Sequence, residues 1–355
     1  PIVHHKQVLP QFMDSANMSP RLSNFAVGIS IFALGLFKKT VLADSLSFYV
    51  SPVFDSTGAG ADVDFFRAWG SSLAYTFQLY FDFSGYSDMA IGAARVFGVR
   101  LPVNFFSPLK ATSIVEFWRR WHMTLSGFLR DYLYIALGGN RNGKVRRYVN
   151  LFLTMLLGGL WHGAGWPFVI WGALHGTYLI INHGWKNLLD RFGLDFSNRP
   201  AYLLVCWFLT FCAWVFSMVF FRAPTLDQGW QITSAMLGMS GFEIPAGVLV
   251  RAGAAGDWAL AMGATAVQGG GAMLLNNFLW LLAAAPIVFF LPNVAQIFHR
   301  YDPVLYKNDR IFVGQRDTGI LSWDYSTGWA IAVAIAGVAG VMTLQQVSEF
   351  LYFQF

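Results

Sequence analysis

Imidazole is well suited to accept a proton near neutral pH, and three histidines lie in stretches rich in apolar and aromatic residues: His122, His162 and His175. His162 follows Leu-Leu-Gly-Gly-Leu-Trp and precedes Gly-Ala-Gly-Trp-Pro. A helix starting at Tyr148 would carry His162 about 21 Å along its axis, deep in a hydrocarbon core of roughly 30 Å. An ionisable residue at that depth is a candidate functional residue.

The glycines around His162 and the following Pro167 predict that the helix breaks there. Backbone could then approach a ligand closely, and His162 could act as a general base. The alternative is a histidine that packs between helices and bonds a neighbouring carbonyl. For His175 we expect this packing or hydrogen-bonding role.

His122 ends the run Glu-Phe-Trp-Arg-Arg-Trp-His. On a helix, Trp118 and Ser126 would share its face, while Glu116 and Arg120 would pair on another face. His122 could orient a substrate or stabilise a developing oxyanion. The alternative is a structural histidine in a buried polar network.

Several familiar sites are missing from the sequence. It has no GxSxG nucleophile elbow, no P-loop and no HExxH zinc motif. Its two cysteines, Cys206 and Cys212, predict small core thiols rather than a disulfide framework or a metal site, so no metal is expected. The glycine-rich turn at 138–143 indicates a basic turn; the alternative is contact with an anionic ligand such as a nucleotide-bearing acyl donor.

The composition predicts the kind of protein, and the kind of secondary structure, that positions these residues. Of the 355 residues, 55% are hydrophobic and only 12% are charged, against about 25% charged in soluble domains. The mean hydropathy is +0.48. These values exclude a disordered chain, and without a long basic run nucleic-acid binding is poorly supported. We predict an all-α polytopic membrane protein, with residues 1–355 as one domain.

Seven apolar stretches qualify as predicted spans: Leu22–Phe37, Phe66–Phe83, Tyr148–Leu160, Pro167–Ile181, Ala201–Phe221, Ala272–Leu291 and Gly328–Leu344. The charged and aromatic segment Ile114–Leu137 predicts an interfacial or re-entrant helix, because its charges would be costly in contact with lipid. Ser84–Val99 and Leu226–Met239 predict two further amphipathic pieces.

Basic residues in the loops predict the orientation. Asn140–Arg147, Gly184–Arg199 and Asn293–Asp324 are rich in lysine and arginine, so the positive-inside rule places them in the cytoplasm. Lys38 and Lys39 break this pattern, and a buried, paired position would explain them. Asp82 and Asp88 are expected to anchor the charged segment that follows them.

Taken in order, five motifs resemble the membrane-bound O-acyltransferase superfamily, most closely its bacterial alginate O-acetylation branch: GLFKKTVLAD (35–44), YFDFSGYSDM (80–89), FWRRWHMTLS (117–126), LRDYLYIALGGN (129–140) and LWHG (160–163). The resemblance is strong over residues 1–185. It implies spanning, re-entrant and horizontal helices around a central funnel, in a chain that lacks the N-terminal spans of the full-length protein.

The resemblance also implies roles for single residues. His162 would be catalytic, and His122 would line the same tunnel as a second catalytic residue. The side chains expected to bind substrate surround them: Asp82, Asn104, Trp118, Arg119, Trp121, Ser126 and Trp161.

The implied reaction moves an acetyl group from a cytoplasmic donor across the inner membrane. Acetyl-CoA is the expected donor, with no bound cofactor, and periplasmic acetyltransferases that modify an exopolysaccharide such as alginate or cellulose are the expected partners. Three alternatives remain: transfer of a D-alanyl group to an envelope polymer, a transporter and a non-catalytic scaffold. Only an enzyme would turn over acetyl-CoA in a way that requires His162.

Overall fold

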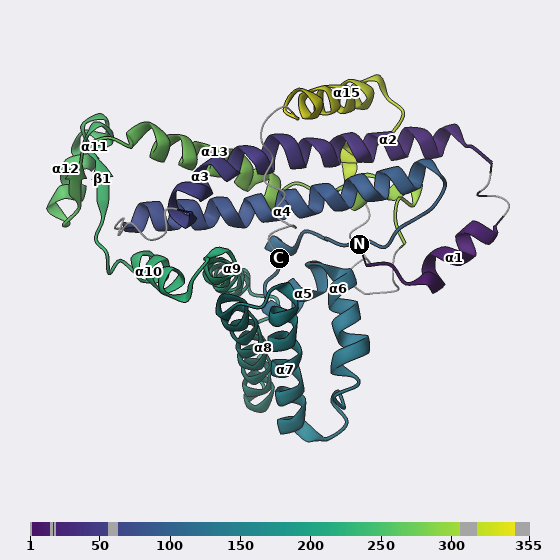
Figure 1. Cartoon of the computed structure of the whole chain (residues 1–355), viewed down its shortest axis with the longest axis horizontal. Helices are drawn as coiled ribbons and strands as arrows, with labels where there is room; N and C mark the ends of the chain where they lie inside the picture. Colours follow the sequence, from purple (N-terminus) through teal and green to yellow (C-terminus); the bar gives the residue numbers. More distant parts are fainter. Residues whose placement is uncertain (1, 15–16, 18, 56–62, 306–317, 345–355) are drawn as a thin grey trace.

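The computed structural model describes the chain except for residues 1, 15–16, 18, 56–62, 306–317 and 345–355 (Figure 1). The described chain is almost wholly helical, which confirms the predicted all-α class. Its two short strands, β1 (Glu243–Pro245) and β2 (Thr265–Val267), pair in parallel. Three basic residues used to orient the chain lie outside the described residues: Lys307, Arg310 and Arg316.

The longest pair of helices runs along the long axis of the molecule (Figure 1). Helix α2 (Leu22–Phe37) continues through the π-helix η2 (Lys38–Ala43) into α3 (Asp44–Phe54), and α4 (Phe65–Val96) packs beside α2. The two backbones are close, because a Cβ atom on Gly28 would lie 2.6 Å from the carbonyl oxygen of Gly92. Small residues permit such close helix packing.

Helix α4 corrects one prediction. Ser84–Val99 is not a separate amphipathic piece, because its residues up to Val96 continue the helix that contains the predicted span Phe66–Phe83. No proline interrupts the run, and Gly85 lies against the backbone of Gly35 in α2 instead of breaking the helix.

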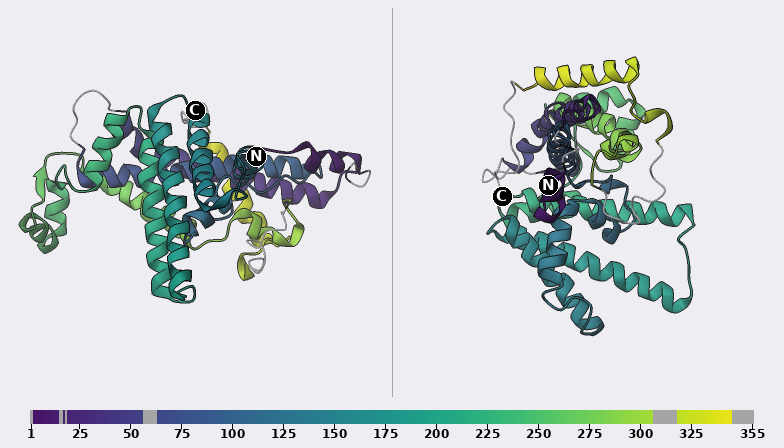
Figure 2. Two further views of the ribbon diagram at one scale, coloured as in Figure 1. Left: turned by 90° about the horizontal axis from the view of Figure 1, so that it is seen from below. Right: turned by 90° about the vertical axis from the view of Figure 1, so that its right-hand side faces the viewer.

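A second group of helices crosses the direction of α2 and α4 (Figures 1 and 2). Short helices α5 (Ile114–Arg120) and α6 (Met123–Phe128) lead through the π-helix η4 (Leu129–Tyr134) to this group. Helices α7 (Gly143–His162) and α8 (Trp166–Phe192) pack side by side, and α9 (Pro200–Arg222) packs against α8.

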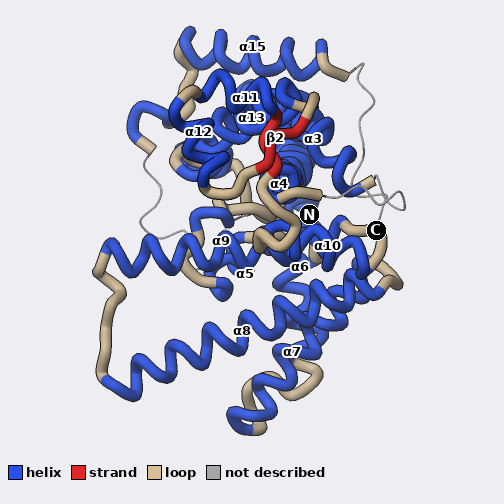
Figure 3. The backbone as a smooth tube through the Cα atoms, turned by 90° about the vertical axis from the view of Figure 1, so that its left-hand side faces the viewer, coloured by secondary structure: helices blue, strands red, loops and turns tan. Residues whose placement is uncertain are grey.

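The remaining helices surround these two groups: α1 (His5–Met13), α10 (Leu226–Met236), α11 (Ala246–Ala252), α12 (Ala254–Ala261), α13 (Gly271–Phe289), α14 (Val294–Ile297) and α15 (Thr327–Met342). Short 3₁₀ turns are η3 (Pro108–Lys110), η5 (His299–Tyr301) and η7 (Gly319–Leu321). Helix α15 packs against α2 (Figure 1) and lies at the top of the molecule in Figure 3. The hydroxyl of Thr40 donates to the carbonyl of Gly340 at 2.9 Å.

Within the described residues, three helical segments are long and apolar enough to cross a membrane: Leu22–Phe54, Pro200–Arg222 and Gly271–Phe289. They contain the predicted spans Leu22–Phe37 and Ala201–Phe221 and most of Ala272–Leu291. The predicted spans at 66–83, 148–160 and 167–181 lie inside α4, α7 and α8, and Gly328–Leu344 corresponds to the shorter apolar helix α15. The main aromatic core lies where α4, α5, α8 and α9 meet.

Candidate active site

A cavity of about 140 Å³ lies between α4, the α5–α6 corner and helices α7, α8 and α9. Both His122 and His162 line it, although forty residues separate them in the sequence. Most of the other lining side chains are aromatic or aliphatic: Leu79, Phe83, Trp118, Trp121, Leu125, Trp161, Trp171, Trp214, Met218 and Phe221, with Asp82 as a charged member. The cavity therefore offers a mostly apolar chamber with two imidazoles in its wall.

His162 is the last residue of α7, so the predicted helix break is confirmed. Helix α8 starts only at Trp166, with Pro167 in its first turn, where proline is tolerated. A Cβ on the intervening Gly163 would lie 2.4 Å from the Phe168 ring, so the turn is too tight for a side chain. The imidazole meets the rings of three residues edge to face, at centroid distances of 5.0, 5.2 and 5.1 Å: Trp161, Trp171 and Phe221.

His122 does not lie on a continuous helix, and this corrects the prediction for Ile114–Leu137. Helix α5 ends at Arg120, and His122 has a φ angle of 41°, in the left-handed region that non-glycine residues seldom occupy. Its backbone forms the N-cap of α6. His122 therefore shares no helical face with Trp118 or Ser126, and the corner turns its ring against Phe83 at 4.7 Å between centroids.

Asn104 holds this corner. Its backbone carbonyl accepts from the N–H of Met123 at 2.9 Å, and its side-chain Oδ1 accepts from the hydroxyl of Thr124 at 2.8 Å. The same Oδ1 lies 3.1 Å from Nδ1 of His122. An amide oxygen only accepts, so the contact with Asn104 needs a proton on Nδ1 of His122. The N–H of Leu125 lies 3.4 Å from the same Nδ1, and that longer contact needs a lone pair there. The Asn104 Nδ2 group donates to Ser87 at 3.2 Å.

The predicted substrate-binding residues divide into two sets. Four of them line the cavity: Asp82, Trp118, Trp121 and Trp161. Three do not. Asn104 is fully buried behind His122, Arg119 is exposed, and the hydroxyl of Ser126 donates to the backbone carbonyl of Trp118 at 3.0 Å. Ser126 is turned away because the α5–α6 corner puts α6 on a different axis from α5.

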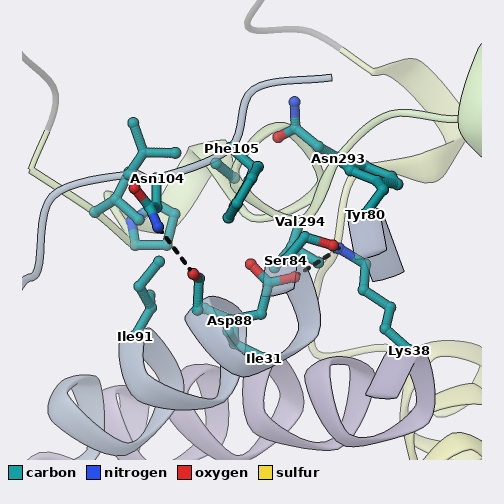
Figure 4. Close-up of a pocket in the computed structure, with 15 residues that line it drawn as sticks. Ile31, Lys38, Tyr80, Ser84, Asp88, Ile91, Asn104, Phe105, Asn293 and Val294 are labelled. Atoms are coloured by element: carbon teal, nitrogen blue, oxygen red, sulfur yellow. Dashed lines mark hydrogen bonds and ion pairs between the residues drawn. The ribbon is translucent and has the colours of Figure 1, made fainter. Parts of the chain in front are cut away.

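Two buried lysines are paired, as expected, but with partners that the sequence did not suggest. Lys38 lies 2.6 Å from Asp88, beside a cavity of about 10 Å³ that also contacts Asn104 (Figure 4). Lys39 lies between Asp44, at 2.8 Å, and Asp82, at 2.5 Å. Asp82 and Asp88 therefore bind η2 to α4, and the prediction that they anchor the segment after them is wrong.

His175 has the hydrogen-bonding role that we predicted. It is fully buried, and its Nδ1 accepts from the indole N–H of Trp118 at 3.3 Å. Its Nε2 lies 3.0 Å from the hydroxyl of Ser217, which in turn donates to the carbonyl of Trp214 at 2.7 Å. Because Nδ1 accepts, the neutral ring carries its proton on Nε2.

Sequence reasoning missed the contributions of α8 and α9 to the cavity, chiefly Trp171, Trp214, Met218 and Phe221. In the sequence these residues look like any apolar residue of a membrane helix. Only the crossing of the helices distinguishes those that line the cavity.

Comparison with known proteins gives consistent results. A family model described as the membrane-bound O-acyltransferase family matches residues 1–223. A peptidoglycan O-acetyltransferase of Helicobacter pylori is 45% identical over 244 residues, covering 69% of this chain and 45% of that protein. A probable alginate O-acetylase of Azotobacter vinelandii is 37% identical over 369 residues, covering 100% of this chain and 66% of that protein.

A more distant relative is a teichoic acid D-alanyltransferase of Streptococcus thermophilus. It is 30% identical over 193 residues, covering 52% of this chain and 46% of that protein. The chain thus spans between 45% and 66% of the length of these three relatives.

Proposed function

The chain belongs to the membrane-bound O-acyltransferase family, and from this premise we propose that it takes part in O-acetylation of a cell-envelope polysaccharide, with His162 as the catalytic base. The observation that carries the proposal is the meeting of His162 and His122 in one mostly apolar cavity. The acceptor polymer is an exopolysaccharide of the alginate or cellulose kind. Transfer of D-alanine is less favoured, because the D-alanyltransferase relative matches less of the chain at lower identity.

The proposed reaction transfers an acetyl group from a thioester to a hydroxyl. The hydroxyl oxygen attacks the thioester carbonyl carbon, while neutral His162 takes the hydroxyl proton. When the tetrahedral intermediate collapses, the carbon–sulfur bond breaks, and the protonated His162 returns the proton to the departing thiolate. The buried rings of Trp171 and Phe221 shield one side of His162 from water and so favour transfer over hydrolysis of the donor, whereas the ring of Trp161 is 55% exposed.

His122 takes the second role in this proposal. Protonated His122, donating from Nε2, would stabilise the negative charge on the carbonyl oxygen. With Nδ1 protonated toward Asn104, neutral His122 would instead accept a hydrogen bond at Nε2 from the incoming hydroxyl. In either role His122 contacts the reacting groups directly. Both roles require the left-handed backbone conformation of His122, which turns its ring into the cavity.

The setting of the reaction follows the sequence analysis. We place the chain in the bacterial inner membrane as a single domain, with its basic loops in the cytoplasm and acetyl-CoA arriving from that side. The corner formed by α5, α6 and η4 would be the re-entrant part of a funnel, and the acetyl group would pass to periplasmic partner proteins. A lipid bilayer is the expected surrounding of the three long apolar helices.

The test uses the purified protein reconstituted in vesicles with acetyl-CoA labelled in the acetyl group. Wild type, His162→Ala and the surface variant Lys186→Ala are compared for thioester loss and label transfer. We expect His162→Ala to lose turnover by roughly 10²–10⁴-fold, the contribution of one general acid–base group, and Lys186→Ala to match wild type. Circular dichroism and detergent stability report whether each variant folds.

Two results would overturn the proposal. Equal turnover in wild type and in folded His162→Ala would remove His162 from the chemistry. Absence of thioester loss in every protein, with folding intact, would remove acetyl-CoA as the donor that this chain itself consumes.

A further inference from the structure

A second cavity, of about 260 Å³, lies between η4, α7 and α8. Its lining includes the cationic side chains of Arg130 and Arg147, together with Tyr134 and His183. Arg130 also pairs with Asp131 at 2.6 Å, and Arg147 contacts the ring of His183 at 3.1 Å. Arg147 lies in α7, within the basic segment 140–147 that the sequence analysis predicts to be cytoplasmic. This cavity suits a ligand that carries anionic groups.

Trp118 separates this cavity from the one that contains His162. Of the described residues that line these two cavities, it alone is common to both. Its side chain is nearly buried, and its ring lies edge to face against Trp171 at 5.8 Å and His175 at 5.1 Å between centroids. Trp118 is therefore the shared wall of the two cavities.

The wall is fixed by a directed hydrogen-bond chain. The indole N–H donates to Nδ1 of His175, whose Nε2 donates to Ser217, whose hydroxyl donates to the carbonyl of Trp214. Every donor in this chain has one acceptor, so the imidazole is held in a single tautomer. A histidine that only filled space would not need this arrangement, since an aliphatic side chain could pack among the same rings.

We propose that Trp118 is a movable wall between the two cavities, that His175 is the positioning residue holding it closed, and that an anionic acyl thioester entering from the cationic cavity displaces Trp118 to reach His162. The identity of the ligand in this inference rests on the proposed function. The position of Trp118 between the two cavities does not depend on that function. In the closed position, water from the cationic cavity is kept from His162. An extended thioester arm that enters from the cationic cavity breaks one hydrogen bond and moves one ring.

The first test measures how fast a reagent passes Trp118 into the His162 cavity, and it needs no catalysis. A cysteine is placed in the His162 cavity by Leu125→Cys, in a background where Cys206 and Cys212 are alanine. A membrane-impermeant methanethiosulfonate reagent is added to inside-out vesicles, on the side of the basic loops. We expect slow labelling in this background, and labelling roughly tenfold faster when Trp118→Ala or His175→Leu is added, the ratio expected for loss of one buried hydrogen bond.

Three further variants separate a positioning role of His175 from a general loosening of the helix packing. His175→Asn keeps an acceptor near the position of Nδ1, so we expect its labelling rate to stay near that of the background. Thr210→Ala is the matched control for Ser217→Ala, because the Thr210 hydroxyl on the same helix donates to the carbonyl of Cys206, within its own helix, at 2.7 Å. Ser217→Ala should raise the labelling rate and Thr210→Ala should not. Equal rates in all variants, or an equal rise in both alanine variants, would overturn the proposal.

A double variant gives the second test. If His175 acts only through Trp118, then Trp118→Ala with His175→Leu should label no faster than Trp118→Ala alone. An additive rise would assign His175 a separate role and overturn the positioning argument. If the labelling rates follow this pattern but the wild type does not consume acetyl-CoA, the proposed donor is contradicted while the role of Trp118 as a wall still holds.

Discussion

The side-chain oxygen of Asn104 lies 3.1 Å from Nδ1 of His122, and Nε2 is the nitrogen that faces away from Asn104. Asn104 also bonds the backbone of Met123 and the hydroxyl of Thr124, so one buried residue holds both the corner and the imidazole. The family resemblance implies substrate binding for Asn104, whereas its contacts with the corner favour a role in positioning His122.

The first prediction concerns Asn104. We expect Asn104→Leu to lower acetyl transfer roughly 10- to 100-fold, as loss of a group that orients a functional histidine commonly does. Asn104→Asp keeps an oxygen acceptor and should retain more activity. Ser87→Ala removes only the partner of the amide Nδ2 and should have the smallest effect. Rates measured in vesicles check this order, and equal losses in Asn104→Leu and Asn104→Asp would contradict it.

The second prediction concerns the backbone of His122, which has a φ angle of 41°. Left-handed geometry costs roughly 1–2 kcal/mol for most residues, while asparagine tolerates it better. We therefore expect His122→Val to lower the free energy of unfolding in detergent by more than His122→Asn, with a difference of about 1 kcal/mol. Both variants should lose activity, so a stable but inactive His122→Asn would separate the chemistry of the ring from the strain of the corner.

The third prediction uses the ion pair between Lys38 and Asp88, which lie 2.6 Å apart with side chains 16% and 14% exposed. Lys38→Met leaves a nearly buried carboxylate without its cation and should lower the free energy of unfolding by about 3–5 kcal/mol. The double variant Lys38→Met with Asp88→Leu removes both charges and should recover most of that loss. Chemical unfolding in detergent checks both values.

A surface pair serves as the control for this prediction. Arg130 and Asp131 lie 2.6 Å apart but are 56% and 38% exposed. Arg130→Met should therefore change the free energy of unfolding by less than about 1 kcal/mol. A loss as large as that of Lys38→Met, or a double variant no more stable than Lys38→Met alone, would contradict the argument from burial.

The features that sequence predicted well are those fixed by local chemistry. The end of α7 at His162 follows from a proline that cannot continue the helix and glycines that allow a tight turn. Lys38 and Lys39 each pair with an aspartate, because an isolated charge is costly in an apolar setting. Both arguments need only the residues themselves and their neighbours in the chain.

The features that sequence missed depend on contacts between distant segments. His122 adopts left-handed geometry because Asn104, eighteen residues earlier, bonds the corner around it. Helical spacing predicted that Ser126 would face the same cavity, yet the corner turns Ser126 toward the carbonyl of Trp118. Similarly, Asp82 pairs with Lys39 because α2 and α4 approach closely, which no periodicity within α4 reveals.

The last prediction tests how tightly α7 must pack to place His162. A Cβ on Gly159 would lie 2.3 Å from the carbonyl oxygen of Phe168 in α8, and one on Gly172 would lie 2.6 Å from the carbonyl oxygen of Met155. Because both obstacles are backbone atoms, Gly159→Ala must push α7 and α8 apart one turn from His162. We expect a lower melting temperature and a large loss of acetyl transfer.

Gly184 in the same helix α8 is the matched control, because a Cβ there meets no atom within 4 Å. Alanine favours the helix over glycine by roughly 0.5–1 kcal/mol, so Gly184→Ala should keep activity and melt at the same or a higher temperature. Opposite shifts in the two variants would show that the helix contact, rather than glycine content, positions His162. Full acetyl transfer by Gly159→Ala would mean that the end of α7 tolerates displacement, and would weaken the case that the cavity geometry sets the chemistry.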